Sequence, residues 1–292
     1  MVKEFLDYLR FERRRSPETI ESYETSLREF ENFFLTIDKQ LTWSSVDEDV
    51  VRDWMEHLMD SGMAASSVGT RFAALRSFFR FALSRELVQR DPTYRVEPPK
   101  RPKPLPHFMK ESEMDRLLDG VEWGDTYEDL LERAVIVTFY ETGIRRAELI
   151  GLDDSCVDFA ARQIKVTGKG NKQRIVPFGE ELETTLRRYM EARDREVTRV
   201  DDATFVNEKG RRIGEKKVAG IVRRRLSLVS TQKKLSPHVL RHTFATAMLN
   251  HGSGIESVRR LLGHASASTT EIYTHTTFEQ LKRVYKEAHP RA

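Results

Sequence analysis

Apolar residues in the first ninety positions recur every three or four residues, the spacing that places them on one face of an α-helix. The longest stripe opens with Ser16 as an N-cap and Pro17 in the first turn. It continues through Ile20, Tyr23, Leu27, Phe30 and Phe34. This stretch is therefore predicted to be a long helix with one buried face.

Three shorter stripes predict three more helices in the same region. The first carries Val2, Phe5, Leu6 and Leu9. The next follows Asp47 as a cap and turns Val50, Trp54 and Leu58 inward. The last runs from Ser67 to about Val88 and buries Val68, Phe72, Leu75, Phe79 and Leu83. Together the stripes predict a helical N-terminal domain over residues 1–90.

Proline marks the end of this domain. Six of the ten prolines fall within Asp91–His107. Because proline lacks an N–H group and fixes φ, this stretch should be extended and unable to form a helix. We interpret residues 91–107 as a linker.

The pattern becomes mixed over residues 108–292. Two strands, Arg162–Val166 and Gln173–Phe178, surround the glycine-bearing hairpin TGKGNK. Helices are expected at Glu111–Leu118, Tyr127–Tyr140 with Gly143 as C-cap, Glu180–Val197, Glu215–Ser227, His238–Asn250, Ile255–Leu262 and Phe278–Ala288. The fold class is therefore mainly α: a helical domain followed by a mixed α/β domain, mostly helical with a small antiparallel sheet.

Composition fits a globular chain with 39% hydrophobic and 33% charged residues. No apolar run approaches the roughly 20 residues of a membrane span, and the N-terminus lacks the features of a signal peptide. Cys156 is the only cysteine, so no intrachain disulfide can form. We expect a cytoplasmic protein without a membrane partner.

Charge is distributed unevenly. Residues 1–97 hold 14 Lys/Arg and 18 Asp/Glu, whereas the rest of the chain holds 35 and 28, which suggests a polyanionic partner for the second domain. Within the acidic first domain, one predicted helix carries Arg71, Arg76, Arg80 and Arg85 against no acid before Glu86. A solvated face is the ordinary explanation, but the segregation favours contact of Arg71, Arg76 and Arg80 with DNA.

Four stretches carry candidate chemistry: TGIRRAEL (142–149), GKGNKQRIVP (168–177), SPHVLRHTFATAML (236–249) and LGHASASTTEIYTH (262–275). If Arg145 opens a helix, Glu148 lies one turn further and could orient its guanidinium. Taken alone, Lys169 is more typical of a solvent-exposed turn. Tyr273, taken alone, is more typical of a buried tyrosine whose hydroxyl group is hydrogen-bonded.

A metal site is also conceivable, because His238 and His242 are four residues apart. The zinc signature H-E-x-x-H requires glutamate after the first histidine, where this chain has Val239. With no cysteine ligands available, we predict no metal and take His242 as a packed residue beside Phe244.

Considered together, these residues suit a single phosphate group. Arg145 and Arg241 could clamp its non-bridging oxygens, since fixed cations stabilise the charge that builds there during in-line displacement. The Tyr273 hydroxyl, with a pKa near 10, needs a cationic pocket and a nearby histidine to lose its proton. Lys169 could protonate the departing alkoxide.

At these residues the chain resembles the tyrosine recombinase/integrase family, and most of all its short Xer-type members. TGIRRAEL, GKGNKQRIVP, HVLRHTFAT, LLGHAS and TTEIYTH all match family motifs, in the family's order. The helical domain and linker match the family's core-binding, SAM-like domain. The resemblance thus covers nearly the whole chain and implies the fold of DNA breaking-rejoining enzymes.

The resemblance implies a role for each residue of the catalytic set. Arg145 and Arg241 would hold the scissile phosphate, with Glu148 supporting the first of them. Lys169 would be the general acid, His238 the acid–base histidine and His264 a hydrogen-bond donor to the phosphate. Tyr273 would be the nucleophile that forms a 3′-phosphotyrosyl link, without metal, ATP or another cofactor.

The family recombines two DNA duplexes through a four-subunit synapse and a Holliday junction, and each subunit lends its C-terminal helix to a neighbour. The resemblance therefore implies a homotetramer, or a heterotetramer with a second recombinase, on double-stranded DNA in the nucleoid. Resolution of chromosome dimers, with a DNA translocase as a further partner, is the expected task. Alternatives are a mobile-element integrase, a type IB topoisomerase and a DNA-binding module without catalysis.

Overall fold

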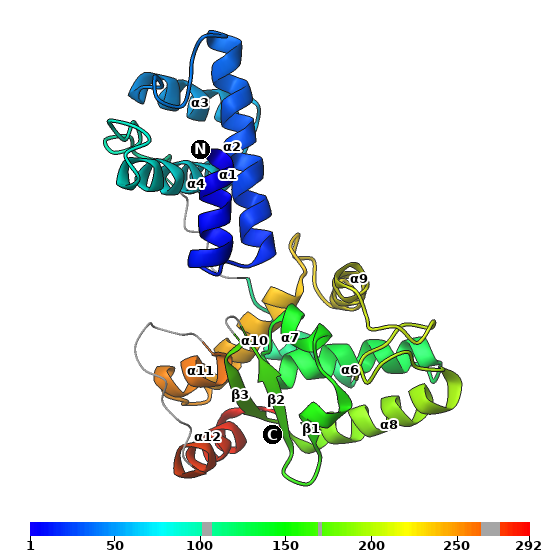
Figure 1. Ribbon diagram of the computed structural model, residues 1–292. Helices are drawn as coiled ribbons and strands as arrows, with labels where there is room; N and C mark the ends of the chain where they lie inside the picture. Colours follow the sequence, from blue (N-terminus) through cyan, green and yellow to red (C-terminus); the bar gives the residue numbers. More distant parts are fainter. Residues whose placement is uncertain (101–106, 169–170, 264–274) are drawn as a thin grey trace. The chain divides into compact units, whose positions relative to one another are not determined.

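The computed structural model of the protein describes residues 1–100, 107–168, 171–263 and 275–292, with residues 275–279 as backbone alone. It divides into two compact units, Met1–Pro104 and Leu105–Ala292 (Figure 1). Helices dominate both, and the second contains one three-stranded antiparallel sheet. The predicted fold class is therefore confirmed.

The first unit consists of helices around an aromatic core. They are α1 (Val2–Asp7), which continues as a π-helix over Tyr8–Glu12, α2 (Pro17–Ile37), α3 (Glu48–Asp60) and α4 (Ala65–Ser84). Ser16 and Asp47 occupy the predicted N-cap positions of α2 and α3. The Asp47 carboxylate accepts from the backbone N–H groups of Asp49 and Val50, whereas the Ser16 side chain makes no capping hydrogen bond. The Trp43 ring lies 4.5 Å from that of Phe78, between centroids, in the middle of this core.

One predicted core position, Leu83, is wrong, whereas Val50 does pack against the core without being fully buried. On α3 Val51 is fully buried while Val50 is only half-buried, and on α4 Leu83 is 42% exposed while Ala82 is buried. Helical spacing allows either neighbour, because residues three and four positions apart lie on the same helix face. Packing against the core therefore selects Val51 and Ala82 as the fully buried residues.

The chain after α4 folds back onto the first unit. Arg76 donates to the carbonyl groups of Thr93 and Val96, at 3.1 and 2.6 Å. The Val96 side chain is buried in the same core. The beginning of the predicted linker is thus bonded to the first unit, and residues 101–106 lie outside the described residues.

The second unit is built around one buried helix. Its helices are α5 (Glu111–Leu118), α6 (Tyr127–Thr142), α7 (Arg146–Ile150), α8 (Glu180–Glu196), α9 (Glu215–Leu226), α10 (Pro237–Asn250), α11 (Ile255–Leu262) and α12 (His275–Ala288). Every residue of α6 from Ala134 to Thr142 is buried. The helices α8, α9 and α10 contact α6, so the hydrophobic core of the unit lies along it (Figure 1).

The sheet has the order β1 (Val157–Asp158), β2 (Gln163–Thr167), β3 (Gln173–Pro177). Lys165 pairs with Ile175, and Thr167 with Gln173. The predicted β2 began one residue too early, because Arg162 has a φ of 49° and cannot continue a strand. The sequence did not predict β1, since two residues are too few to show an alternation.

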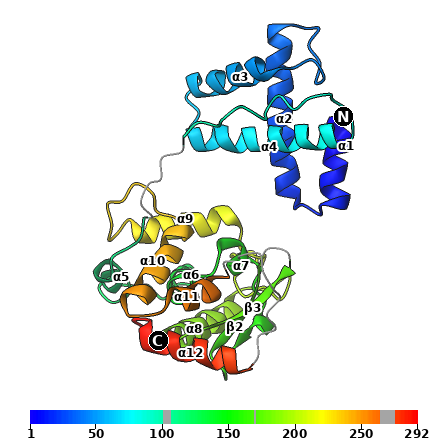
Figure 2. The ribbon, with the colours of Figure 1, turned by 90° about the vertical axis from the view of Figure 1, so that its left-hand side faces the viewer.

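The C-terminal helix docks on its own domain. Helix α12 contacts α10 and α11, and the ribbon shows it beside α11 (Figure 2). Its Leu281, Tyr285 and Ala288 are buried in one cluster with Phe244 and Leu261. The sequence left open whether this helix docks on its own chain or on a neighbour, and in the single chain it docks in cis. None of the helices in the described ranges has the length and apolar character that a membrane-spanning helix requires.

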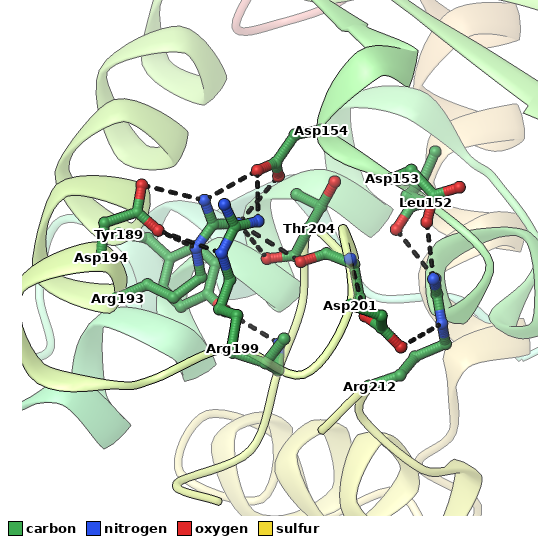
Figure 3. Close-up of polar contacts among 12 residues, drawn as sticks. Leu152, Asp153, Asp154, Tyr189, Arg193, Asp194, Arg199, Asp201, Thr204 and Arg212 are labelled. Atoms are coloured by element: carbon green, nitrogen blue, oxygen red, sulfur yellow. Dashed lines mark hydrogen bonds and ion pairs between the residues drawn. The ribbon is translucent and has the colours of Figure 1, made fainter. Parts of the chain in front are cut away.

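A buried arginine secures the loop that follows α8 (Figure 3). Arg193 has no exposed surface, and its Nη1 and Nη2 atoms donate to the two carboxylate oxygens of Asp154 at 2.8 and 3.0 Å. Its Nε donates to Asp194, and its Nη1 also donates to the Thr204 carbonyl. This network joins α8 to the loops around Asp154 and Thr204.

Candidate active site

The first site element is the turn between α6 and α7. Helix α6 ends at Gly143 in the left-handed region, with a φ of 58°, as the predicted C-cap requires. A Cβ atom here would lie 2.5 Å from Cδ1 of Phe244, so no larger residue fits. The turn delivers Arg145 to the N-cap of α7.

Glu148 holds Arg145 as the sequence suggested. Its Oε2 accepts from the Arg145 backbone N–H at 2.7 Å, and its Oε1 accepts from Nη1 at 2.8 Å. The Glu148 side chain is 2% exposed, whereas that of Arg145 is 37% exposed. The carboxylate therefore fixes one edge of the guanidinium and leaves part of the side chain accessible.

Arg241 comes from α10 and converges on the same place. It is 7% exposed, and it donates to the carbonyl oxygens of Gly143 and Leu262, at 2.5 and 2.6 Å. Arg145 donates to the next carbonyl, that of Gly263, at 3.0 Å. The end of α11 thus orients both guanidinium groups, and each has five N–H donors, so some remain for a ligand.

Arg174 of β3 is a site residue that the sequence analysis missed. Its Nη1 and Nη2 donate to the two carboxylate oxygens of Glu148 at 2.7 and 2.9 Å, and its Nε donates to the Leu261 carbonyl at 2.8 Å. Only 6% of its surface is exposed. One signal was available: Arg174 shares a strand face with the apolar Val176, which places a charged side chain in the interior.

The centre is cationic. Burial opposes ionisation of Glu148, but hydrogen bonds and charges from Arg174 and Arg145 outweigh it and lower the pKa to about 2. Burial, and then the charges of Arg145 and Arg174, lower the pKa of Arg241 to about 10, so it remains charged at neutral pH. Three guanidinium groups surround one carboxylate, an arrangement that favours an anionic ligand.

The two histidines of α10 are both exposed. The interpretation of His242 as a packed residue is therefore wrong. Burial of part of the ring, then the charges of His238 and Arg241, lower the pKa of His242. No group of three potential metal ligands occurs in the part of the chain that the structure describes. The adjacent arginines would in addition repel a dication.

Three predicted residues, Lys169, His264 and Tyr273, lie outside the described residues. Their neighbours in the chain do reach the site. A Cβ built on Gly168 would lie 3.2 Å from Oε1 of Glu148, and one on Gly263 would lie 3.0 Å from Nη1 of Arg174. The segments that lead into Lys169 and His264 therefore both contact the Arg174–Glu148 pair.

The candidate DNA contacts of the first unit differ from one another. Arg71 forms an ion pair with Glu29 of α2, so the helix face is not as free of acids as the sequence implied. Arg76 is engaged by the backbone of Thr93 and Val96. Arg80 is exposed and makes no side-chain hydrogen bond or ion pair with the described residues.

Comparisons with known proteins identify the family of both units. Residues 107–280 match the phage integrase family, and residues 2–86 match the phage integrase N-terminal SAM-like domain. Tyrosine recombinase XerC of Pelotomaculum thermopropionicum is 37% identical over 100% of this chain and 98% of its own length. Tyrosine recombinase XerD of Oceanobacillus iheyensis is 33% identical over 100% and 98%.

Solved structures agree with this assignment. The XerH site-specific recombinase bound to palindromic difH substrate has a TM-score of 0.72 at 21% identity, over 97% of this chain and 83% of that one. The Tn1549 transposon integrase in complex with circular intermediate DNA has a TM-score of 0.74 at 18% identity, over 96% and 97%. These two similarities support the fold. The match to the family and the full-length relatives show that the chain belongs to the phage integrase family and is a site-specific tyrosine recombinase.

Proposed function

We propose that the cationic centre binds the scissile phosphate of a DNA recombination site, and that Tyr273 cleaves the strand there. The observation that carries this proposal is the convergence of Arg145 and Arg241 on the carbonyls of Gly263 and Leu262. Two guanidinium groups from separate helices are held at one point next to His264 in the chain. Fixed cations of this kind suit a phosphate with two non-bridging oxygens.

The chemistry follows from the residues proposed for it. The Tyr273 oxygen attacks phosphorus while the bond from phosphorus to the 5′ oxygen breaks. The tyrosine proton passes to His238, and Lys169 gives a proton to the departing 5′ oxygen. One phosphodiester bond is replaced by one phosphotyrosyl bond, so the energy is conserved and rejoining is the same step in reverse.

Arg145 and Arg241 contribute by electrostatics. Charge grows on the non-bridging oxygens in the transition state, and prepositioned cations stabilise it without reorganising. His264 would add a hydrogen bond to the same oxygens. Because guanidinium groups supply the positive charge, we propose that cleavage needs no metal ion and no nucleotide cofactor.

In the cell we propose that the protein resolves chromosome dimers in the nucleoid. Support comes from relatives named XerC and XerD that align over the full chain. The active form would be a homotetramer, or a heterotetramer with a second recombinase, on two DNA duplexes joined by a Holliday junction. The helical first unit would hold the recombination site, with Arg80 among its contacts, and a DNA translocase would activate the complex.

Covalent trapping tests the chemistry. The protein is incubated with genomic fragments, denatured, and separated from unbound DNA; sequencing the attached DNA gives the cleavage site. A nicked duplex of that site then accumulates the adduct, because the short fragment that carries the released 5′-hydroxyl group diffuses away. Tyr273→Phe should form no adduct while binding the same duplex, and persistent adducts in that variant would refute the assignment of the nucleophile.

The location of the trapped DNA tests the cellular role. A single site near the chromosomal terminus would support resolution of chromosome dimers. Sites at the ends of a mobile element would instead support an integrase with the same chemistry. Relaxation of supercoiled DNA without any preferred site would support a topoisomerase-like activity.

A further inference from the structure

We infer that Arg174 is a positioning residue for DNA cleavage: with Glu148 it forms one buried ion pair that sets the catalytic segments relative to one another. This inference rests on the proposed function, since it concerns how the same centre is assembled. Arg174 does not face a ligand, because its guanidinium is used by Glu148 and the Leu261 carbonyl. It would act through the residues that the pair holds.

Four segments meet at this pair. Glu148 bonds Arg145 through both the backbone N–H and Nη1. Gly168, which precedes Lys169, packs against the Glu148 carboxylate. The carbonyl of Leu261 and the backbone of Gly263, just before His264, lie against Arg174. The charge of Arg241 is coupled to the same pair.

The contacts at position 174 require an arginine, and another cationic side chain cannot replace it. Its planar guanidinium presents donors on two edges, so it can bridge both carboxylate oxygens and the Leu261 carbonyl at once. Lysine has a single ammonium group, which cannot reach all three acceptors from one rotamer. Gly263 adjoins this plane with a φ of 65°, and a Cβ atom there would crowd the arginine at 3.0–3.1 Å.

Loss of Arg174 has two separable effects. First, the Glu148 carboxylate stays buried, and Arg145 is its one remaining partner in the network. A buried carboxylate whose negative charge is not balanced by enough positive charge tends to take up a proton. A protonated Glu148 would no longer hold Arg145 by charge. Second, the loss of Arg174 removes the bridge to Leu261, so the segment that leads into His264 loses a fixed contact.

The experiment measures single-turnover cleavage of the nicked duplex by the full chain, at saturating protein, from about pH 5 to about pH 9. Arg174→Gln should cleave about 100-fold more slowly at pH 7.5, as expected when a catalytic group is displaced by about 1 Å. Its rate relative to the wild type should also show an acidic limb between about pH 5 and pH 7, as Glu148 becomes protonated. Taking this ratio removes any fall that protonation of the general base causes in both proteins.

Arg174→Lys separates charge from geometry. It keeps a cation beside Glu148, so the acidic limb should disappear, but the bridge is lost and cleavage should remain at least about tenfold slower. This variant also preserves most of the side-chain volume, so it carries the test if Arg174→Gln does not fold.

Arg193 offers a matched control, since it too is a buried arginine that bridges a carboxylate and a backbone carbonyl (Figure 3), and it shares no hydrogen-bond partner with Arg174. Arg193→Gln and Arg193→Lys should lower the melting temperature but leave the cleavage rate of the folded protein and its pH profile unchanged. Equal losses in the Arg193 and Arg174 variants would overturn the inference, because stability alone would then explain both.

Two failures can be told apart. If the wild type forms no adduct with any DNA, the proposed function falls and the inference falls with it. If the wild type cleaves and both Arg174 variants cleave at its rate, the inference alone is overturned.

Discussion

Glu141 is a buried carboxyl group beneath the C-terminal helix, and Glu141→Gln should make the docking of this helix less sensitive to pH. Its Oε2 accepts from the backbone N–H of Gly179 at 2.7 Å and from the Tyr285 hydroxyl at 3.1 Å. Its Oε1 has no partner among the described residues. A neutral carboxyl group tolerates such a place, but a carboxylate does not.

Burial raises the pKa of Glu141 from 4.5 to about 8. The folded domain therefore keeps a proton that the unfolded chain releases, and stability falls as pH rises between these two values. His289 behaves in the opposite way, because burial lowers its pKa from 6.5 to about 4 and stability rises with pH over that window. The two slopes oppose one another below pH 6.5.

Between pH 6.5 and pH 8 the slope of Glu141 remains without this opposition. One proton corresponds to about 1.4 kcal/mol per pH unit, so the loss over this range is about 2 kcal/mol. For a domain of this size that is a fall of about 4–8 °C in melting temperature. Glutamine keeps an oxygen acceptor for Gly179 and Tyr285 and cannot ionise, so the variant should lack this fall.

Thermal melts of the wild type and Glu141→Gln at pH 6.5, 7.25 and 8 measure the difference. Amide hydrogen exchange of residues 280–288 shows whether α12 is the part that loosens. Glu287→Gln serves as the control, because Glu287 is exposed on the same helix and its variant should follow the wild type. If the stability difference between wild type and Glu141→Gln stays constant over this range, the reasoning is wrong.

Three other changes test the site and the first unit. Gly143→Ala should cost about 2–4 kcal/mol in urea denaturation, from a left-handed φ and a collision with Phe244, and should abolish cleavage by moving the carbonyl that holds Arg241. Arg80→Gln should leave melting unchanged and reduce the salt dependence of DNA binding by about one unit of slope, whereas Arg76→Gln should destabilise the first unit; the reverse assignment of effects would contradict the structure. Cleavage should proceed unchanged in EDTA, and a loss that Zn²⁺ or Mg²⁺ restores would revive a metal mechanism.

Most of the fold followed from hydrophobic spacing, because the long helices bury one continuous face. The predicted start of α2, the bounds of α5 and the cap at Gly143 needed only local information. Errors arose where tertiary packing chose between adjacent residues, as with Ala82 and Leu83. The two residues of β1 are a strand only because β2 lies beside them, which no local pattern reveals.

The contacts in the site also divide into those that local spacing predicts and those that only the tertiary fold creates. Arg145 and Glu148 are three residues apart, so a helix beginning at Arg145 was enough to predict their contact, and the structure confirms it. Arg174 meets Glu148 across 26 residues and Leu261 across 87, so neither partner could be inferred from spacing.

What the sequence did offer at position 174 was a charge on the apolar face of a strand. A charged group is rarely buried unless it is paired, so an arginine at such a position implies a carboxylate partner from elsewhere in the fold. Among the acids in the four candidate stretches, Glu148 is the nearest in sequence to Arg174, and it was already expected to orient Arg145. An acid shared by two arginines joins their segments, and this makes Arg174 part of the assembly of the centre rather than only of the core beneath it.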